Sequence, residues 1–203
     1  MKVVIVDYGM GNISSITAAL KFLDVDSISV SNKSSKIKSA DKLILPGVGS
    51  FSEAMSSIKR LEIDKYLEEE VLKKKKPILG ICLGMQLMCN SSSEHSHTNG
   101  LGFINGVIRE FSESILSTPH IGFNQVKSNN DSRLFKGINN GSDFYFSHSF
   151  RLATSINISH STCIYIDEFF ASFEQDNIAG VQFHPELSQT NGLKLLKNFI
   201  EYF

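Results

Sequence analysis

Two short segments of this chain carry residue types that could perform nucleophilic catalysis. The first is Gly80-Ile81-Cys82-Leu83-Gly84, which follows the apolar run Pro77-Ile78-Leu79. The second lies about a hundred residues later and reads Val181-Gln182-Phe183-His184-Pro185-Glu186. Together they supply a thiol, a histidine and a carboxylate two residues beyond that histidine. These are the parts of a cysteine nucleophile, the base that takes its proton and the acid that orients the base.

We expect Cys82 at the tip of a strand-turn-helix elbow. The backbone of a nucleophile at such a tip is strained, so its neighbours must be small, and Gly80 and Gly84 meet that need. The helix that follows would point its N-terminus at the sulfur, which favours the thiolate. The alternative for Cys82 is a buried core thiol, which is the role we assign to Cys89 and Cys163 because they lack this context.

A developing oxyanion on the substrate needs hydrogen-bond donors. The backbone N–H of Leu83 is placed to supply one of them. The second candidate donor is the Gly47-Val48-Gly49 segment, which ends a neighbouring parallel strand at the same edge of the sheet. Removing one such donor typically lowers the rate about 10²–10³-fold.

His184 is the candidate base. It follows a strand and precedes Pro185, whose ring biases His184 toward an extended backbone. Glu186 is then close enough along the chain to hold the imidazole in one tautomer. A His-x-Glu segment alone is weak evidence, and the cysteine elbow makes it strong. For His148 and His120, a place at the edge of the site and a structural role both stay open.

Alternating apolar runs and helical patterns must position these residues. Strands are expected over 3–6, 27–30, 42–45 and 78–81, and helices over 13–23, 51–72 (broken near 60–64) and 83–89. This alternation predicts parallel β-α units. The second half predicts more strands, over 106–109, 122–126, 144–146, 163–166, 169–173 and 178–183, before a last helix over about 191–203. We therefore expect an α/β fold with a mixed β region in its second half, in one domain spanning 1–203.

Composition restricts the class of protein. The 203 residues are 41% hydrophobic with a net charge of -1, which argues against disorder and against a nucleic-acid-binding surface. Three cysteines without a Cys-x-x-Cys pair predict reduced thiols in a cytoplasmic protein rather than a disulfide frame or a zinc site. We expect no metal, no cofactor, no signal peptide and no membrane contact.

Six motifs point to a known family. They are Asp7-Tyr8-Gly9-Met10-Gly11-Asn12, Leu45-Pro46-Gly47-Val48-Gly49, Gly80-Ile81-Cys82-Leu83-Gly84-Met85-Gln86, Gly122-Phe123-Asn124-Gln125-Val126, Tyr145-Phe146-Ser147-His148-Ser149 and Gln182-Phe183-His184-Pro185-Glu186. Over essentially its whole length, the chain resembles the class I (triad) glutamine amidotransferases. More narrowly, it resembles the glutaminase subunit of imidazole glycerol phosphate synthase. The cysteine elbow and the His-Pro-Glu segment occur across the class, and the other four motifs are specific to that subunit.

This resemblance implies a fold, a reaction and a partner. The fold would be flavodoxin-like, with a central, mostly parallel sheet flanked by helices. Cys82 would attack the side-chain amide of glutamine and release ammonia, and water activated by His184 would then free glutamate. The substrate would be contacted by Gln86, Glu94, Ser147, His148 and Ser149, with Glu94 on its ammonium group and 147–149 on its carboxylate. Ammonia would pass into a separate, barrel-shaped synthase subunit of a heterodimer. That subunit would make imidazole glycerol phosphate and aminoimidazole carboxamide ribonucleotide in histidine biosynthesis.

Two positions depart from the family pattern. Phe123 stands where the family generally has tryptophan, and Leu187 where it commonly has lysine. Together with Asn12, these residues would face the partner. Leucine cannot form the salt bridge of that lysine, which indicates a matching change across the interface. These departures leave open a diverged copy that supplies ammonia to a sugar amidotransferase in surface polysaccharide biosynthesis. Independently of them, a stand-alone cysteine hydrolase also stays open. A non-enzymatic regulatory role is disfavoured because all three catalytic residue types are present.

Overall fold

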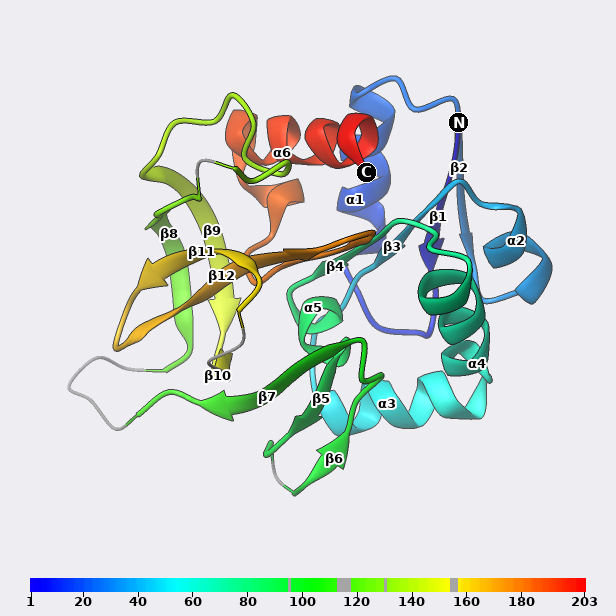
Figure 1. The fold of residues 1–203 in the computed structure, drawn as a ribbon, viewed down its shortest axis with the longest axis horizontal. Coiled ribbons are helices and arrows are strands. Elements are labelled where there is room, and N and C mark those ends of the chain that lie inside the picture. The colour runs from blue at the N-terminus through cyan, green and yellow to red at the C-terminus, as the bar shows by residue number, and fades with distance from the viewer. Residues whose placement is uncertain (95, 113–117, 130, 154–156) are drawn as a thin grey trace.

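A twisted central β-sheet runs through the computed structural model, which describes residues 1–94, 96–112, 118–129, 131–153 and 157–203 (Figure 1). Within these residues the sheet has the strand order β11-β12-β13-β4-β3-β1-β2. Five strands are parallel: β1 (Lys2–Val6), β2 (Ser27–Ser31), β3 (Lys42–Leu45), β4 (Ile78–Ile81) and β13 (Ile178–Val181). The other two strands, β12 (Glu168–Gln175) and the edge strand β11 (Ser159–Ile164), are antiparallel to their neighbours. The mostly parallel sheet predicted from the sequence is confirmed.

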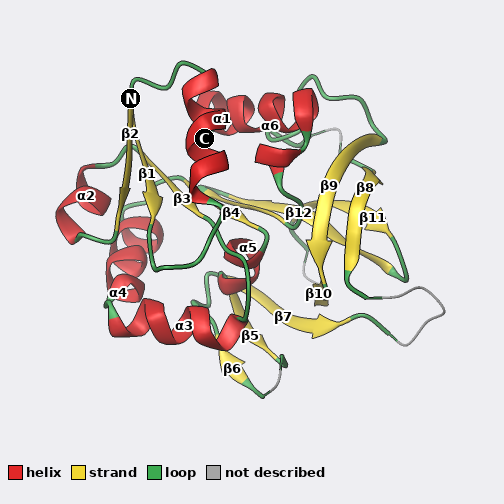
Figure 2. Cartoon of the chain, turned by 180° about the vertical axis from the view of Figure 1, so that it is seen from behind, coloured by secondary structure: helices red, strands yellow, loops and turns green. Residues whose placement is uncertain are grey.

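Helices cover both faces of this sheet (Figures 1 and 2). One face carries α1 (Ile13–Phe22) and α6 (Gln189–Tyr202). The other carries α2 (Ser34–Ser39), α3 (Phe51–Arg60), α4 (Ile63–Leu67), the π-helix η1 (Glu68–Lys73) and α5 (Leu83–Leu87). Side chains of a strand alternate between faces, so Val4 and Val6 of β1 join one core and Val3 and Ile5 join the other.

Smaller β elements complete the second half. A four-stranded sheet has the order β10-β7-β5-β6, formed by β5 (Cys89–Ser92), β6 (Thr98–Asn99), β7 (Ile104–Glu110) and β10 (Phe150–Ala153). An antiparallel pair, β8 (His120–Val126) and β9 (Ser142–His148), lies beside β11, to which the Lys127–Thr162 bridge connects it. The mixed β region expected in the second half is therefore present.

One expected helix differs from the structure. Residues 83–89 were expected to be helical throughout, but α5 ends at Leu87 and Cys89 begins strand β5. The carbonyls that would continue the helix accept hydrogen bonds from a later segment: Leu87 O from Leu101 N–H (2.8 Å) and Cys89 O from Gly102 N–H (3.1 Å). A long-range contact thus ends this helix. The break expected near 60–64 is confirmed, since Glu62 has a left-handed backbone (φ 55°) between α3 and α4.

The sheet brings the two candidate catalytic segments together. In register, Gly80 of β4 lies between Leu45 of β3 and Gly180 of β13, and Ile81 lies beside Val181. The three parallel strands therefore end side by side, at the edge where open α/β sheets bind their ligands. Cys82 leaves β4 at this edge, and His184 lies three residues beyond the end of β13.

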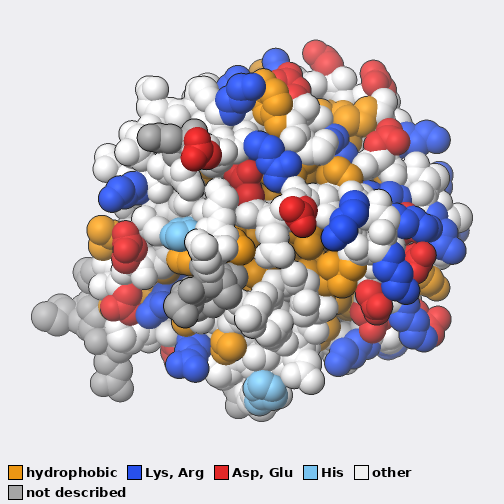
Figure 3. Space-filling view, in the orientation of Figure 1, with side chains coloured by type: hydrophobic (Ala, Val, Ile, Leu, Met, Phe, Trp, Pro, Cys, Tyr) orange, Lys and Arg blue, Asp and Glu red, His pale blue; other side chains and the backbone are white. Residues whose placement is uncertain are grey.

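The surface is mixed in charge. Lys and Arg side chains gather on one side of the face in Figure 3, over the region of α2 and α4, with acidic side chains among them. Several of these charges form pairs, such as Lys65–Glu62 and Lys73–Glu69. Among the described residues, no helix is long and apolar enough to cross a membrane.

Candidate active site

The backbone of Cys82 has the strain expected of a nucleophile elbow. Its φ and ψ are 53° and -112°, values that a side-chain-bearing residue rarely adopts. Glycines on both sides make this turn sterically possible. A Cβ on Gly84 would lie 1.8 Å from the carbonyl oxygen of Leu45, and one on Gly80 would lie 2.7 Å from the backbone of Met85. Strand β3 and helix α5 are thus packed directly against the elbow.

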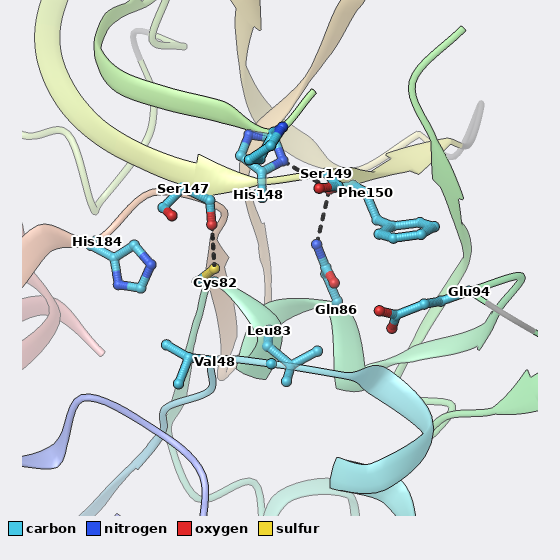
Figure 4. A pocket seen from close by; sticks show the side chains of 12 residues that line it. Val48, Cys82, Leu83, Gln86, Glu94, Ser147, His148, Ser149, Phe150 and His184 are labelled. Carbon is cyan, nitrogen blue, oxygen red and sulfur yellow. Dashed lines mark hydrogen bonds between the residues drawn. The ribbon is translucent and has the colours of Figure 1, made fainter. Parts of the chain in front are cut away.

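The segment that carries His184 is fixed from two directions. The N–H of Cys82 donates to Val181 O (2.8 Å), which ties the elbow to the end of β13. The N–H of His184 donates to Tyr145 O of β9 (2.8 Å), and Ser188 Oγ donates to His184 O (2.6 Å). The thiol and the imidazole, a hundred residues apart in the chain, consequently face the same cavity (Figure 4).

Glu186 lies directly behind the imidazole. Its Oε1 is 2.9 Å from Nδ1 of His184, and its side chain is fully buried in the short 3-10 helix η2 (Pro185–Leu187). Asn12 Nδ2 donates to the same oxygen at 3.5 Å. The contact between Glu186 and His184 fixes Nδ1 as a donor and leaves Nε2 as the ring nitrogen available to the sulfur.

The electrostatics of His184 favour the imidazolium. Burial lowers its pKa, but hydrogen bonds with Cys82 and Glu186 outweigh burial and raise the pKa from 6.5 to about 10. A cationic imidazole beside a thiol favours the thiolate. The pair therefore has the electrostatics of a cysteine nucleophile with its base.

The cavity above the elbow has a volume of about 260 Å³. All five residues expected to bind substrate lie in its wall, whose described members are Val48, Gly49, Cys82, Leu83, Gln86, Glu94, Pro119, Ser147, His148, Ser149, Phe150 and His184. Pro119 and Phe150 were not expected in this wall. Phe150 follows the 147–149 motif directly, and that adjacency is the one signal that could have identified it.

Gln86 and Glu94 are both held by backbone groups. Gln86 Nε2 donates to the carbonyl of Phe150 at 3.0 Å. Glu94 Oε2 accepts the N–H of Phe51 at 2.6 Å, at the start of α3, and the carboxylate lies across the cavity from His184 in Figure 4. A carboxylate at this helix N-terminus is favourable electrostatically.

The candidate oxyanion donors divide into two groups. Leu83, Val48 and Gly49 line the cavity, and Gly49 has a positive φ of 97°. Gly47 is not among the described lining residues. A Cβ at Gly47 would lie 2.7 Å from Leu83 Cβ and 2.8 Å from Gly84 N, so the residue allows β3 to approach the elbow closely.

His148 and His120 form a neutral pair beside the cavity. His148 Nδ1 donates to Phe150 O (2.8 Å), and its Nε2 is 3.1 Å from Nδ1 of His120. Burial lowers the pKa of His148 to about 3, only partly offset by the bond to Phe150, and burial lowers that of His120 to about 4. Both roles left open for His148 are compatible with the structure: it lies in the cavity wall, and it makes a structural hydrogen bond to Phe150.

The residues expected to face a partner lie at or near the surface. Phe123 is 51% exposed and Leu187 is 40% exposed, whereas Asn12 is half-buried against Glu186. Phe123 is paired with Tyr145 across the β8–β9 hairpin and contacts it edge-to-face, with ring centroids 5.5 Å apart. Phe123 and Tyr145 therefore form an exposed-to-half-buried aromatic pair on two paired strands, of which β9 also holds the backbone of His184.

The other two cysteines are core residues, as expected. Cys89 and Cys163 are 0% and 2% exposed, and burial raises the pKa of both to about 12. Neither is among the described residues that line the cavity. No group of three or more potential metal ligands occurs in the described part of the chain.

The model of the glutamine amidotransferase class-I family matches residues 4–202. Two solved structures share the fold: PurLQS from Thermotoga maritima has a TM-score of 0.71 at 18% identity and covers 99% of this chain and 98% of its own. The glutaminase domain of Trypanosoma brucei CTPS, with bound acivicin, has a TM-score of 0.68 at 14% identity and covers 98% and 94%. The chain thus has the fold of a class I glutamine amidotransferase.

Relatives with higher identity narrow this class. "Imidazole glycerol phosphate synthase subunit HisH 1" of Campylobacter jejuni (strain 81-176) is 45% identical over 199 residues, which cover 97% of this chain and 98% of the relative. The corresponding HisH subunit of Methanosarcina acetivorans is 42% identical over 202 residues, covering 98% of each chain. The chain belongs to the class I glutamine amidotransferases and, within them, to the HisH subunits.

Proposed function

We propose that this chain is the glutaminase subunit of an imidazole glycerol phosphate synthase and hydrolyses glutamine to glutamate and ammonia. One observation carries the proposal: the Cys82 thiol and the His184 imidazole face one cavity, and the buried Glu186 orients the imidazole at 2.9 Å. The names of the relatives, which are subunits of that synthase, support the particular reaction.

Catalysis uses the Cys82 thiolate and the His184 imidazolium, the ion pair that forms when the thiol proton passes to the imidazole. The thiolate attacks the side-chain carbonyl carbon of glutamine, and donors at Leu83 and the Val48–Gly49 backbone stabilise the resulting oxyanion. The carbon–nitrogen bond then breaks, and the nitrogen leaves as ammonia with the proton from His184. Water gives a proton to His184 and attacks the thioester, which releases glutamate and returns the proton to the sulfur.

The cavity wall fits a glutamine substrate. Gln86 and the carboxylate of Glu94 bind the polar groups of its α-carbon end, Glu94 on the ammonium group. The backbone of residues 147–149 receives the carboxylate. A cavity of about 260 Å³ is large enough for one small amino acid.

The experiment that tests the chemistry is glutamate release by the purified chain with its synthase partner. Cys82→Ala should lower glutamine turnover about 10³-fold or more, because the nucleophile is removed. Cys163→Ala is the matched control, since it removes a buried thiol that is not part of the described cavity wall, and it should retain turnover. Equal activity in the two variants would refute the assignment of Cys82.

The partner in this proposal is a separate, barrel-shaped synthase subunit that forms a heterodimer and receives the ammonia. The three free cysteines fit a cytoplasmic setting, where thiols stay reduced. Addition of the histidine-pathway synthase and its nucleotide ligand should strongly stimulate glutamate release. Glutaminase activity that is unchanged when this partner and its ligand are added would instead support the diverged copy that supplies a sugar amidotransferase.

A further inference from the structure

A buried amide contacts the sulfur of Cys82 from behind the cavity. Gln182 is 0% exposed, and its Nε2 is 3.7 Å from Cys82 Sγ. It is not among the described residues that line the cavity, so it touches the reacting sulfur without being part of the substrate pocket. Its Oε1 accepts a hydrogen bond from Gln86 Nε2 at 2.9 Å.

The orientation of this amide follows from hydrogen-bond logic. The carbonyl of Phe150 can only accept, so the Gln86 atom facing it at 3.0 Å must be the NH₂ group. That same nitrogen faces Gln182, so the Gln182 atom opposite it must be the carbonyl oxygen. The remaining polar atom of Gln182, which faces the sulfur, is therefore its NH₂ group. The carbonyl of Phe150 thus determines which group donates and which accepts in every hydrogen bond from Phe150 through Gln86 and Gln182 to the sulfur.

Neighbouring side chains hold that carbonyl in place. Neutral His148 donates from Nδ1 to Phe150 O, which makes its Nε2 an acceptor for His120 Nδ1. Nε2 of His120 is then left to accept from Asn124 Nδ2 at 3.3 Å. Every member of this network has one consistent donor or acceptor state, and such networks are rigid.

Two hydrogen-bond partners of the sulfur have opposite effects on its protonation. The carbonyl of Ser147, 3.8 Å away, accepts from the thiol and favours the protonated sulfur. The NH₂ group of Gln182 donates and favours the thiolate. When His184 takes the proton, the Ser147 contact is lost and the Gln182 contact strengthens, because hydrogen bonds to charged acceptors are stronger.

We propose that Gln182 is a catalytic residue whose side-chain amide donates a hydrogen bond to the Cys82 sulfur and stabilises the thiolate. This hydrogen bond stabilises the thiolate before it forms the thioester, and again when hydrolysis of the thioester releases the sulfur as thiolate. This inference rests on the proposed glutaminase function, but the contact itself is testable without glutamine.

Among the described residues, few other titratable groups face the sulfur. His184 approaches it from the segment after β13, and Glu186 acts on it only through His184. Tyr8 approaches from the segment after β1, and burial, together with the Cys82 charge, holds its pKa above the ordinary value. His148, from β9, is neutral. The titration of Cys82 alkylation near neutral pH therefore reports the sulfur and its imidazole.

The test is the pH dependence of Cys82 alkylation by iodoacetamide, followed by peptide mass spectrometry that separates Cys82 from Cys89 and Cys163. Gln182→Leu removes the donor at similar size. Gln182→Glu keeps an acceptor for Gln86 but turns a carboxylate oxygen toward the sulfur. The alkylation midpoint should rise by about one pH unit in Gln182→Leu and further in Gln182→Glu, since one unit is a tenfold change in thiolate fraction.

Glutamine kinetics add a second readout. In Gln182→Glu, which keeps the acceptor for Gln86, kcat should fall about tenfold or more while KM changes little, because Gln182 itself does not form part of the described substrate pocket. A merely structural role would lower the unfolding temperature and leave the alkylation midpoint unchanged, and that result would overturn the proposal. The alkylation midpoints test the contact between Gln182 and the sulfur without glutamine. A wild-type protein that releases no glutamate would therefore refute the proposed function but not this contact.

Nuclear magnetic resonance on the wild type covers the case in which neither variant folds. The ¹⁵N-labelled side-chain amide of Gln182 should titrate with the same midpoint as Cys82 alkylation and should shift when Cys82 is alkylated. Amide signals that stay constant through that titration would overturn the proposal.

Discussion

Replacing Gly192 by alanine should destabilise the protein, although Gly192 lies inside helix α6. Alanine is normally the better helix residue by about 1 kcal/mol, so helix propensity alone predicts stabilisation. The structure predicts the reverse. A Cβ at Gly192 would lie 1.8 Å from the carbonyl oxygen of Pro185 and 2.7 Å from its carbonyl carbon. Both atoms are backbone, so no side-chain rotation can relieve the contact.

The magnitude follows from these opposing effects. Overpacking in a tight interior costs about 1–3 kcal/mol, and the shape of this site favours the upper end. Subtracting the helix gain leaves a loss of about 1–2 kcal/mol in the free energy of unfolding. For a chain of this size the unfolding temperature should fall by about 2–8 °C.

Activity should fall as well, because Pro185 lies between His184 and Glu186. To accommodate the new methyl group, η2 and α6 must move apart by more than an ångström. A displacement of that size at a catalytic group can cost about a hundredfold in rate. Thermal unfolding and glutamate release measure the two effects. Thr190→Ala, at an exposed position of the same helix, is the control and should change neither by much. A Gly192→Ala protein with higher stability and full turnover would refute the reasoning.

Three further predictions concern the base and the partner surface. Glu186→Gln should lower glutamine turnover by about 10³–10⁴-fold, because an amide can turn its NH₂ group toward Nδ1 and select the wrong tautomer of His184; turnover near that of the wild type would remove Glu186 from the mechanism. The raised pKa of His184 contributes stability that is complete below about pH 6.5 and is lost as the pH rises toward about 10. Urea unfolding at these two pH values should therefore show a larger fall for the wild type than for His184→Gln, and equal falls would contradict the pKa shift. Leu187→Lys should weaken binding to the synthase partner about tenfold or more if Leu187 packs in an apolar pocket there, since burying an unpaired charge is costly; an unchanged affinity by titration calorimetry would exclude Leu187 from the buried interface.

Local chemistry made the elbow and the base predictable. Cys82 between Gly80 and Gly84 carries its own signal, because a strained tip needs small neighbours. The strand patterns before Cys82 and His184 then indicate that both lie at one sheet edge, and the pairing of β4 with β13 confirms this.

Features set by distant contacts were not predictable in the same way. The end of α5 depends on hydrogen bonds from residues near Gly100, which the apolar pattern of 83–89 does not encode. Gly192 looked like an ordinary helix residue, because only the folded chain brings the Pro185 carbonyl against it. Gln182 lies two residues before the proposed catalytic histidine in the sequence, but the direction of its contact with the sulfur depends on the partners of Gln86.

The central claim is that Cys82 forms a thioester with the γ-carboxyl group of glutamine. Rapid acid quenching of the enzyme during turnover, followed by digestion and mass spectrometry, tests it most directly. The account predicts a γ-glutamyl adduct on the peptide that contains Cys82, and neither adduct nor turnover in Cys82→Ala. Glutamine turnover that persists in Cys82→Ala, with no adduct on the wild-type peptide, would contradict it.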